Sequence, residues 1–219
     1  MKQPDLSRRQ LLVRSLWVGG GVVAGLQLPR PRALAAATAS NEPEVLTPEE
    51  WATVEAMTAR LVPTDHEPGA MEAGCVNFID KALANEDAAL RPLYTAGLFG
   101  VDAVARAEGG ARFSALPAEK QDAVLRALED GEAASWPAGG PTSRDFFAQV
   151  WQHTLWGFLA EPKYAGNRDF AGWRVLGYPG GRHKLGGYTP QQMAGKAPVE
   201  SVWGEKLPRA ARREGSGDE

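Results

Sequence analysis

Five segments between Thr47 and Ala160 repeat apolar residues at spacings of three and four, which is the pattern of one face of an α-helix. Turn and capping residues separate the segments. Thr47-Pro48-Glu49-Glu50 has the form of a capping box, Pro63 stops the first segment, and Gly131 stops the fourth. We therefore expect helices at about 48–62, 70–84, 92–107, 117–130 and 143–160, which predicts an all-α fold with a single helical domain of about five helices.

The helical pattern is lost after Pro162. Residues 163–207 form a stretch rich in glycine, proline and aromatic residues, and we interpret it as an irregular C-terminal arm. Disordered chain is usually poor in aromatics, so we expect the arm to bury its aromatic side chains against the helical domain or against a partner. We expect the domain to span residues 38–162, and the charged tail at 208–219 to be disordered.

The first 37 residues have the three parts of an export signal. A basic start leads into Ser7-Arg8-Arg9-Gln10-Leu11-Leu12, then an apolar, glycine-containing run to Leu28, then small residues with several A-x-A cleavage sites. This order predicts a twin-arginine signal, with Ser7, Arg8, Arg9, Leu11 and Leu12 as its defining residues. We expect the twin-arginine translocon to export the folded chain to the periplasm; an uncleaved N-terminal anchor is the alternative.

The charge and the cysteine content argue against several classes of function. Without residues 1–37 the chain holds 18 basic and 26 acidic groups, so its net charge gives no reason to expect nucleic acid as a partner. Cys75 is the sole cysteine, which excludes an intrachain disulfide, a thiolate zinc cluster and a C-x-x-C-H haem attachment site.

One cluster, Asp65-His66-Glu67, has the residue types of a metal or acid–base site. Three consecutive side chains cannot all converge on one ion, and a zinc site would need a further ligand such as His153 or His183. We favour a structural or interface role for this loop, in which Thr64 and Asp65 form a turn between two prolines or cap the next helix.

Three other candidates receive structural interpretations. We expect His153 to be a packed or rim histidine in the aromatic fifth segment, with a haem or flavin contact as the alternative. Cys75 lies on an apolar stripe and is expected to be a buried, inert thiol. Glu72 and Asp80 share the second segment, and we expect both on a solvated helix face rather than as an acid–base pair.

Several short motifs together resemble the small (gamma) subunit of membrane-bound gluconate 2-dehydrogenase, also called subunit 3. The resemblance covers about 46–181. It rests on these stretches: Leu46-Thr47-Pro48-Glu49-Glu50, the 63–74 loop, Phe78-Ile79-Asp80, Gly157-Phe158-Leu159, Tyr164-Ala165-Gly166-Asn167, and the 172–180 segment that begins Gly172-Trp173-Arg174.

This resemblance implies a periplasmic oxidoreductase complex, held at the cytoplasmic membrane, in which the small subunit is not catalytic by itself. The implied partners are a large flavoprotein of the glucose–methanol–choline type, which carries FAD, and a separate multihaem cytochrome c subunit. No cofactor is expected in this chain, which is implied to bind the flavoprotein and take it through the translocon.

We expect the partner interface to draw on one loop and the arm. The residues concerned are Asp65, His66, Trp173, Arg174, Tyr178, Tyr188 and Trp203. For Trp173, Arg174 and Tyr178, packing on this chain's own helices is the open alternative. Two other functions also remain open, a stand-alone metal-assisted hydrolase using the 65–67 loop and a free sugar-binding module that stacks sugars on the arm aromatics.

Overall fold

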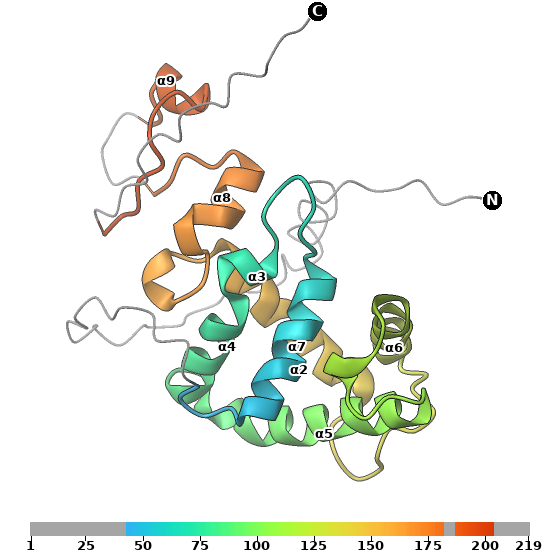
Figure 1. The fold of residues 1–219 in the computed structure, drawn as a ribbon. Helices are drawn as coiled ribbons and strands as arrows, with labels where there is room; N and C mark the ends of the chain where they lie inside the picture. The colour runs from blue at the N-terminus through green and yellow to red at the C-terminus, as the bar shows by residue number, and fades with distance from the viewer. Residues whose placement is uncertain (1–42, 182–186, 204–219) are drawn as a thin grey trace, which may run out of the picture. The chain divides into compact units, whose positions relative to one another are not determined.

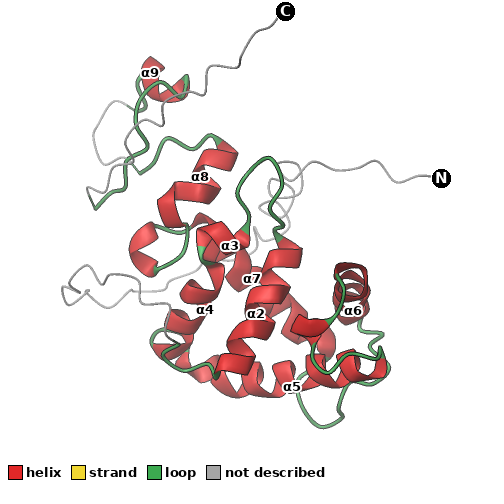
Figure 2. Ribbon diagram, viewed as in Figure 1, coloured by secondary structure: helices red, strands yellow, loops and turns green. Residues whose placement is uncertain are grey.

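The computed structural model describes residues 43–181 and 187–203, and all regular elements in these ranges are helical (Figures 1 and 2). The described chain contains no strand, and one isolated parallel bridge joins Gly180 to Glu200. The all-α prediction is therefore confirmed. The longer helices are α2 (Pro48–Leu61), α4 (Cys75–Ala84), α5 (Arg91–Ala107), α6 (Ala118–Asp130) and α7 (Ser143–Leu159). The shorter ones are α3 (Ala70–Ala73), α8 (Ala171–Leu176) and α9 (Pro190–Met193), with single 3-10 turns η1 (Ala88–Leu90), η2 (Phe113–Ala115), η3 (Pro162–Tyr164) and η4 (Arg168–Phe170).

Part of the sequence-based prediction lies outside the described residues. This holds for the export signal at 1–37, for His183 and for the charged tail at 208–219. Within residues 43–181 and 187–203, no helix has the length and apolarity that a bilayer span requires.

Local sequence chemistry explains where the long helices begin and end. The Thr47 hydroxyl accepts a hydrogen bond from the Glu50 N–H at 3.2 Å, and the Glu50 carboxylate accepts one from the Thr47 N–H at 2.9 Å, which completes the predicted capping box. Helix α6 ends at Gly131, whose φ of +75° is the left-handed conformation that glycine adopts most easily. Both predicted helix boundaries are confirmed.

The predicted helix at 70–84 is two helices, because Gly74 breaks it with a φ of +69°. The Gly74 N–H bonds back to the carbonyls of Ala70 and Met71, which closes α3 after a single turn. A helix of one turn shows no periodicity of its own, so the apolar spacing in the sequence runs across the break and conceals it.

Helix α7 is the centre of the packing. It contacts α2, α3, α4, α5, α6 and α8, in agreement with its apolar sequence. Its own Phe146 and Phe158 are fully buried, and so are large side chains of the elements around it, among them Met57, Tyr94 and Phe113. Gly97 allows close contact as predicted, since a methyl group there would overlap the Phe146 ring, and Gly100 has the same relation to Trp136.

The arm is more helical than the sequence predicted. Its first part forms η3, η4 and α8, and α8 contacts both α3 and α7 (Figure 1). Elements of three to six residues are too short to display a helical period, and this is why the sequence pattern missed them. The arm up to Gly180 therefore covers the end of α7 and lies beside α3.

Candidate functional site

The carboxyl end of α7 is closed by a segment that follows it in the chain. Carbonyls in the last turn of a helix have no partner inside the helix. Here the Asn167 N–H donates to the Gly157 carbonyl at 2.6 Å, and the Asn167 side-chain amide donates to the Ala160 carbonyl at 2.8 Å. Trp173 Nε1 donates to the Leu159 carbonyl at 2.7 Å. Two buried side chains of the arm thus provide hydrogen-bond donors for the carbonyls at the end of the central helix.

Asn167 is the organising residue of this junction. It is fully buried, and its side-chain oxygen accepts a hydrogen bond from the Gly172 N–H at 2.9 Å, close to the start of α8. Its φ of +45° lies in the left-handed region, which asparagine enters more readily than most residues. One side chain therefore links the end of α7 to α8, and an asparagine also suits the backbone shape.

Three glycines let the backbones approach at this junction. A methyl group at Gly166 would overlap the Gly157 backbone, and one at Gly172 would overlap the Phe158 carbonyl. A methyl group at Gly157 would lie 3.1 Å from the Cys75 Cα on α4, tighter than an ordinary contact. The Gly-Phe-Leu, Ala-Gly-Asn and Gly-Trp stretches of the sequence therefore act as one packed unit.

The 63–74 loop joins the same end of the domain through α3. Arg168 of η4 lies against Gly74, with its guanidinium 3.1 Å from the position of a Cβ there. Glu72 closes the loop, since its carboxylate accepts hydrogen bonds from the Gly69 N–H at 2.8 Å and from the Thr64 hydroxyl at 2.6 Å. The 63–74 loop, η4 and α8 therefore form one region around the end of α7.

The Asp65-His66-Glu67 cluster is a turn in this loop. The Asp65 carboxylate accepts a hydrogen bond from the Glu67 N–H at 2.9 Å and lies 3.2 Å from His66 Nδ1. The His66 side chain is 84 % exposed. Among the described residues, no three histidine, cysteine, aspartate or glutamate side chains gather as a metal site requires. The turn interpretation of Asp65 is confirmed, and the partner contact of Asp65 and His66 stays a prediction.

His153 lies at the middle of a buried polar line. Its Nδ1 is 2.8 Å from the Tyr94 hydroxyl, and its Nε2 is 3.3 Å from an Asp87 carboxylate oxygen, in ion-pair range but without hydrogen-bond geometry. The imidazole stacks on the Tyr94 ring and packs against Trp156. The ring is fully buried, so the prediction of a packed histidine is confirmed.

Burial controls the protonation of this line. Desolvation lowers the pKa of His153, and the nearby Asp87 carboxylate partly opposes that shift. Desolvation also raises the pKa of Tyr94 well above its usual value, and Asp87 adds to the effect. The neutral forms of both rings are therefore favoured, and one hydrogen bond joins the Tyr94 hydroxyl to His153 Nδ1.

Cys75 and Asp80 both lie buried on α4. Cys75 is fully buried, its thiol lies 3.6 Å from the Thr154 carbonyl, and burial raises the thiol pKa strongly, so the prediction of an inert thiol is confirmed. The prediction for Asp80 is wrong. Asp80 is 2 % exposed, because its carboxylate accepts hydrogen bonds from three consecutive N–H groups, those of residues 44–46, at 2.6, 3.1 and 2.9 Å.

The predicted interface residues of the arm fall into two groups. Trp173 is 4 % exposed and stacks on Phe170, so this chain's own packing accounts for its burial. Arg174 is exposed, and Tyr178, Tyr188 and Trp203 expose 37, 37 and 56 % of their surface.

A comparison with protein-family models decides the family. The model described as gluconate 2-dehydrogenase subunit 3 matches residues 48–180, which is more than half of the chain. The chain belongs to the gluconate 2-dehydrogenase subunit 3 family. Comparisons with curated proteins and with solved structures gave no match.

The subunit 3 match covers the whole junction at the end of α7. It includes the 63–74 loop, Asn167, Trp173 and Asp80, and it stops at Gly180, shortly after the end of α8. The buried motif residues of this subunit 3 chain have structural roles: they cap helix ends and allow backbone segments to pack closely. The motif residues that face solvent include His66, in the 63–74 loop, and Arg174, on α8.

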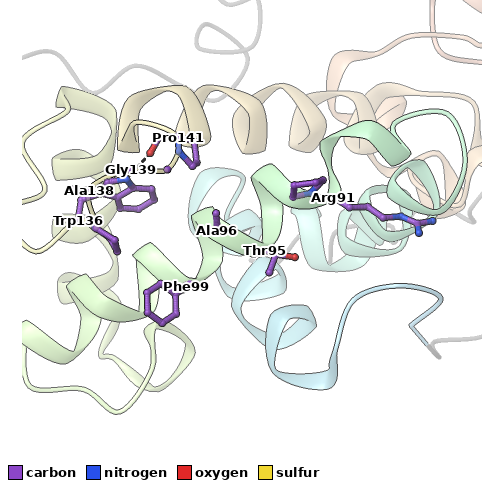
Figure 3. Close-up of a pocket in the computed structure, with 11 residues that line it drawn as sticks. Arg91, Thr95, Ala96, Phe99, Trp136, Ala138, Gly139 and Pro141 are labelled. Atoms are coloured by element: carbon purple, nitrogen blue, oxygen red, sulfur yellow. Dashed lines mark hydrogen bonds between the residues drawn. The ribbon is translucent and has the colours of Figure 1, made fainter.

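Sequence reasoning missed a groove of the subunit 3 domain. Figure 3 shows Phe99 of α5 and Trp136 of the 131–142 loop at one end of it and Arg91 at the other. The groove encloses about 720 Å³, and its Phe99 ring is 61 % exposed. Trp136 Nε1 donates to the Pro141 carbonyl at 2.8 Å, which fixes the loop. The signal in the sequence was Trp136, a large aromatic residue in a loop rich in glycine and proline.

Proposed function

We propose that this chain is the non-catalytic small subunit of a periplasmic, flavin-dependent dehydrogenase that acts on gluconate, another sugar or a polyol. The observation that carries the proposal is the family match over residues 48–180, since subunit 3 is by its description a part of a multisubunit dehydrogenase. In this proposal the chain binds the large flavoprotein subunit, which holds FAD and performs the oxidation. A multihaem cytochrome c subunit then accepts the electrons.

The geometry of the motif residues supports a binding role. Asn167, Gly172 and Trp173 act inward, on the end of α7, and hold a region that presents exposed polar and apolar groups. These groups include His66, Met71, Arg168 and Arg174; Met71 is 54 % exposed. A protein that works by contact needs a rigid surface of this kind rather than convergent catalytic groups.

The N-terminal sequence supports a further part of the proposal. Arg8 and Arg9 stand ahead of an apolar run, as in signals of the pathway that exports folded proteins. We infer that the small subunit carries the signal for both proteins and that the flavoprotein crosses the membrane bound to it. The assembled enzyme then works in the periplasm, at the cytoplasmic membrane.

Affinity purification of the tagged full-length chain from its native periplasm tests the proposal. The expected eluate contains a large protein at near-equal stoichiometry, identified by mass spectrometry, with the absorbance of an oxidised flavin near 450 nm (about the usual flavin maximum). A chain that elutes alone and colourless would contradict the proposal. Metal analysis and a thermal-shift assay with sugars would then address the hydrolase and sugar-binding alternatives.

A further inference from the structure

The exposed apolar side chains of the described residues gather on the arm. Eight large apolar side chains are exposed, and five of them lie between residues 164 and 203: Tyr164, Tyr178, Tyr188, Met193 and Trp203. Soluble proteins normally expose such side chains singly, and a gathered set marks an interaction site. We use the term arm surface for Tyr164, Tyr178, Tyr188 and Trp203 together with Lys163.

Two sets of contacts link the residues of the arm surface. Tyr178 and Tyr188 pack edge to face with ring centroids 6.4 Å apart, and the Tyr188 hydroxyl donates to the Gly180 carbonyl at 3.0 Å. Lys163 Nζ lies 3.4 Å from the centre of the Trp203 ring and 4.7 Å from that of Tyr164. The arm surface therefore combines residues from both ends of the arm.

Two backbone contacts close the arm on itself beneath this surface. The bridge between Gly180 and Glu200 brings the last part of the arm back to the end of α8. The Val202 N–H donates to a Glu161 carboxylate oxygen at 3.3 Å, which places Trp203 near Lys163. These contacts order the aromatic rings but leave much of each ring in solvent, and helix α9 buries none of its residues.

A buried polar atom below the arm surface is incompletely satisfied. The second carboxylate oxygen of Glu161 is buried and has no hydrogen-bond donor among residues 43–181 and 187–203. Such atoms are rare in a finished protein interface, because burying an oxygen without a donor costs free energy.

The charges of the arm differ from those of the domain. Residues 163–207 hold seven basic and three acidic groups, whereas residues 38–162 hold eight basic and 20 acidic groups. An aromatic surface that holds Lys163, in a segment with an excess of basic residues, fits a partner that offers apolar pockets edged by carboxylates. It does not suit an anionic bilayer, since the acidic domain of the same chain would be repelled there.

We propose that the arm surface is the main anchor for the large dehydrogenase subunit, with Tyr188 and Trp203 inserting into apolar pockets on it. This inference rests on the proposed function, because it assumes that the flavoprotein is the partner. It adds that the arm surface supplies most of the binding free energy, and that its two inserting residues, Tyr188 and Trp203, lie beyond the family-matched residues. Tryptophan and tyrosine are the residues that most often do so in protein interfaces.

The test uses the tagged full-length chain co-expressed with the flavoprotein that the wild-type chain recovers. The test variant carries Tyr188→Ala and Trp203→Ala, and the matched control carries Phe99→Ala, which removes an exposed aromatic ring far from the arm in sequence. We expect the double variant to bind the flavoprotein at least about tenfold more weakly and the control to bind as the wild type does. Both should melt within about 2 °C of the wild type, because Trp203 and Phe99 are more than half exposed and the contacts given for Tyr188 lie within the arm itself.

The outcomes separate the two proposals. If the wild-type chain recovers no flavoprotein, the proposed function fails, and this inference fails with it. Wild-type recovery with undiminished binding by the double variant would overturn the inference alone. It would also be overturned if the arm variants abolished a dimer of the chain in sizing experiments, or sedimentation with vesicles containing phosphatidylglycerol, while flavoprotein binding stayed intact.

Discussion

The buried carboxylate of Asp80 on α4 accepts a hydrogen bond from the Leu46 N–H at 2.9 Å, and this contact joins two parts of the chain that lie 34 residues apart. The same carboxylate also binds the N–H groups of Glu44 and Val45. The segment just before α2 is thus fastened to α4 through its backbone. If the chain is cut within 35–39, as the sequence predicts, the cut falls outside the part that Asp80 holds.

Replacing Asp80 with alanine should reduce the free energy of unfolding by about 2–4 kcal/mol. Three N–H groups lose their charged acceptor, and the packing contacts of the buried carboxylate are lost as well. Urea unfolding followed by circular dichroism measures the change. Glu129→Ala, which removes an exposed carboxylate from α6, should stay within about 0.5 kcal/mol of the wild type. Equal stability of Asp80→Ala and the wild type would show that the carboxylate does not hold this segment.

Replacing Asn167 with alanine should cost about 2–4 kcal/mol. The change removes a donor to the Ala160 carbonyl and an acceptor from the Gly172 N–H, and it places a residue without a polar side chain at a left-handed φ. Asn85→Ala is the matched control, since Asn85 is exposed and makes one local hydrogen bond to the Lys81 carbonyl. Unfolding in urea compares the two variants, and a loss no larger in Asn167→Ala would contradict its role at the junction.

Replacing Gly172 with alanine should destabilise the chain by about 1–3 kcal/mol or prevent α8 from docking. A methyl group there would overlap the Phe158 carbonyl, and neither backbone can move without breaking the hydrogen bonds of Asn167 and Trp173. Gly140→Ala serves as the control, because its nearest neighbour would be the Ala96 methyl at 3.9 Å, an ordinary contact. Thermal melts of both variants would decide, and an unchanged Tm for Gly172→Ala would rule out the close approach.

His153 should make stability depend on pH. Burial lowers its pKa in the folded chain below the unfolded value near 6.5, so the unfolded chain binds the proton more readily. Its contribution to stability is therefore complete above about pH 6.5 and is lost as the pH falls below that value. Between the folded and the unfolded pKa the slope approaches about 1.4 kcal/mol per pH unit, and the opposing effect of Asp87 narrows that pH range.

The variant His153→Gln removes this proton-binding site and should flatten the fall in stability between pH 7.5 and 5.5. Urea titrations at several pH values measure it, and Gln152→Ala on the exposed face of α7 should keep the wild-type slope. The acidic groups elsewhere contribute to both chains alike. A slope in His153→Gln as steep as in the wild type would locate the pH dependence in other groups.

Changing Arg8 and Arg9 together to lysine should leave the chain, and the flavoprotein with it, in the cytoplasm. The twin-arginine pathway reads the guanidinium pair, and lysine keeps the charge but not the planar group. Arg14→Lys, which lies within the apolar run, is the control and should be exported normally. Fractionation with immunoblotting measures it, and periplasmic recovery of the double-lysine variant would refute the signal assignment.

The long helices could be predicted from the sequence because each carries its own information. The signals are local: an apolar stripe of three or more turns, a capping box at Thr47 and a glycine at position 131. Each stabilises the helix through hydrogen bonds or burial of residues close in the sequence. The buried states of His153 and Cys75 followed for the same reason, since their neighbours on the same stripe are apolar. The break at Gly74 escaped notice because one turn is too short to leave a pattern.

The sequence by itself determined the helical class, most helix boundaries and, through its motifs, the family. Only the tertiary structure decided what the motif residues do, because their partners lie far away in the chain. Asp80 is buried because residues 44–46 fold back to it, and Trp173 is buried because it donates to the Leu159 carbonyl at the end of α7. The bridge between Gly180 and Glu200 brings the last part of the arm back to the end of α8. The spacing of apolar residues in the sequence indicates which segment is helical. Whether a polar side chain is buried depends on which distant backbone groups the fold brings next to it.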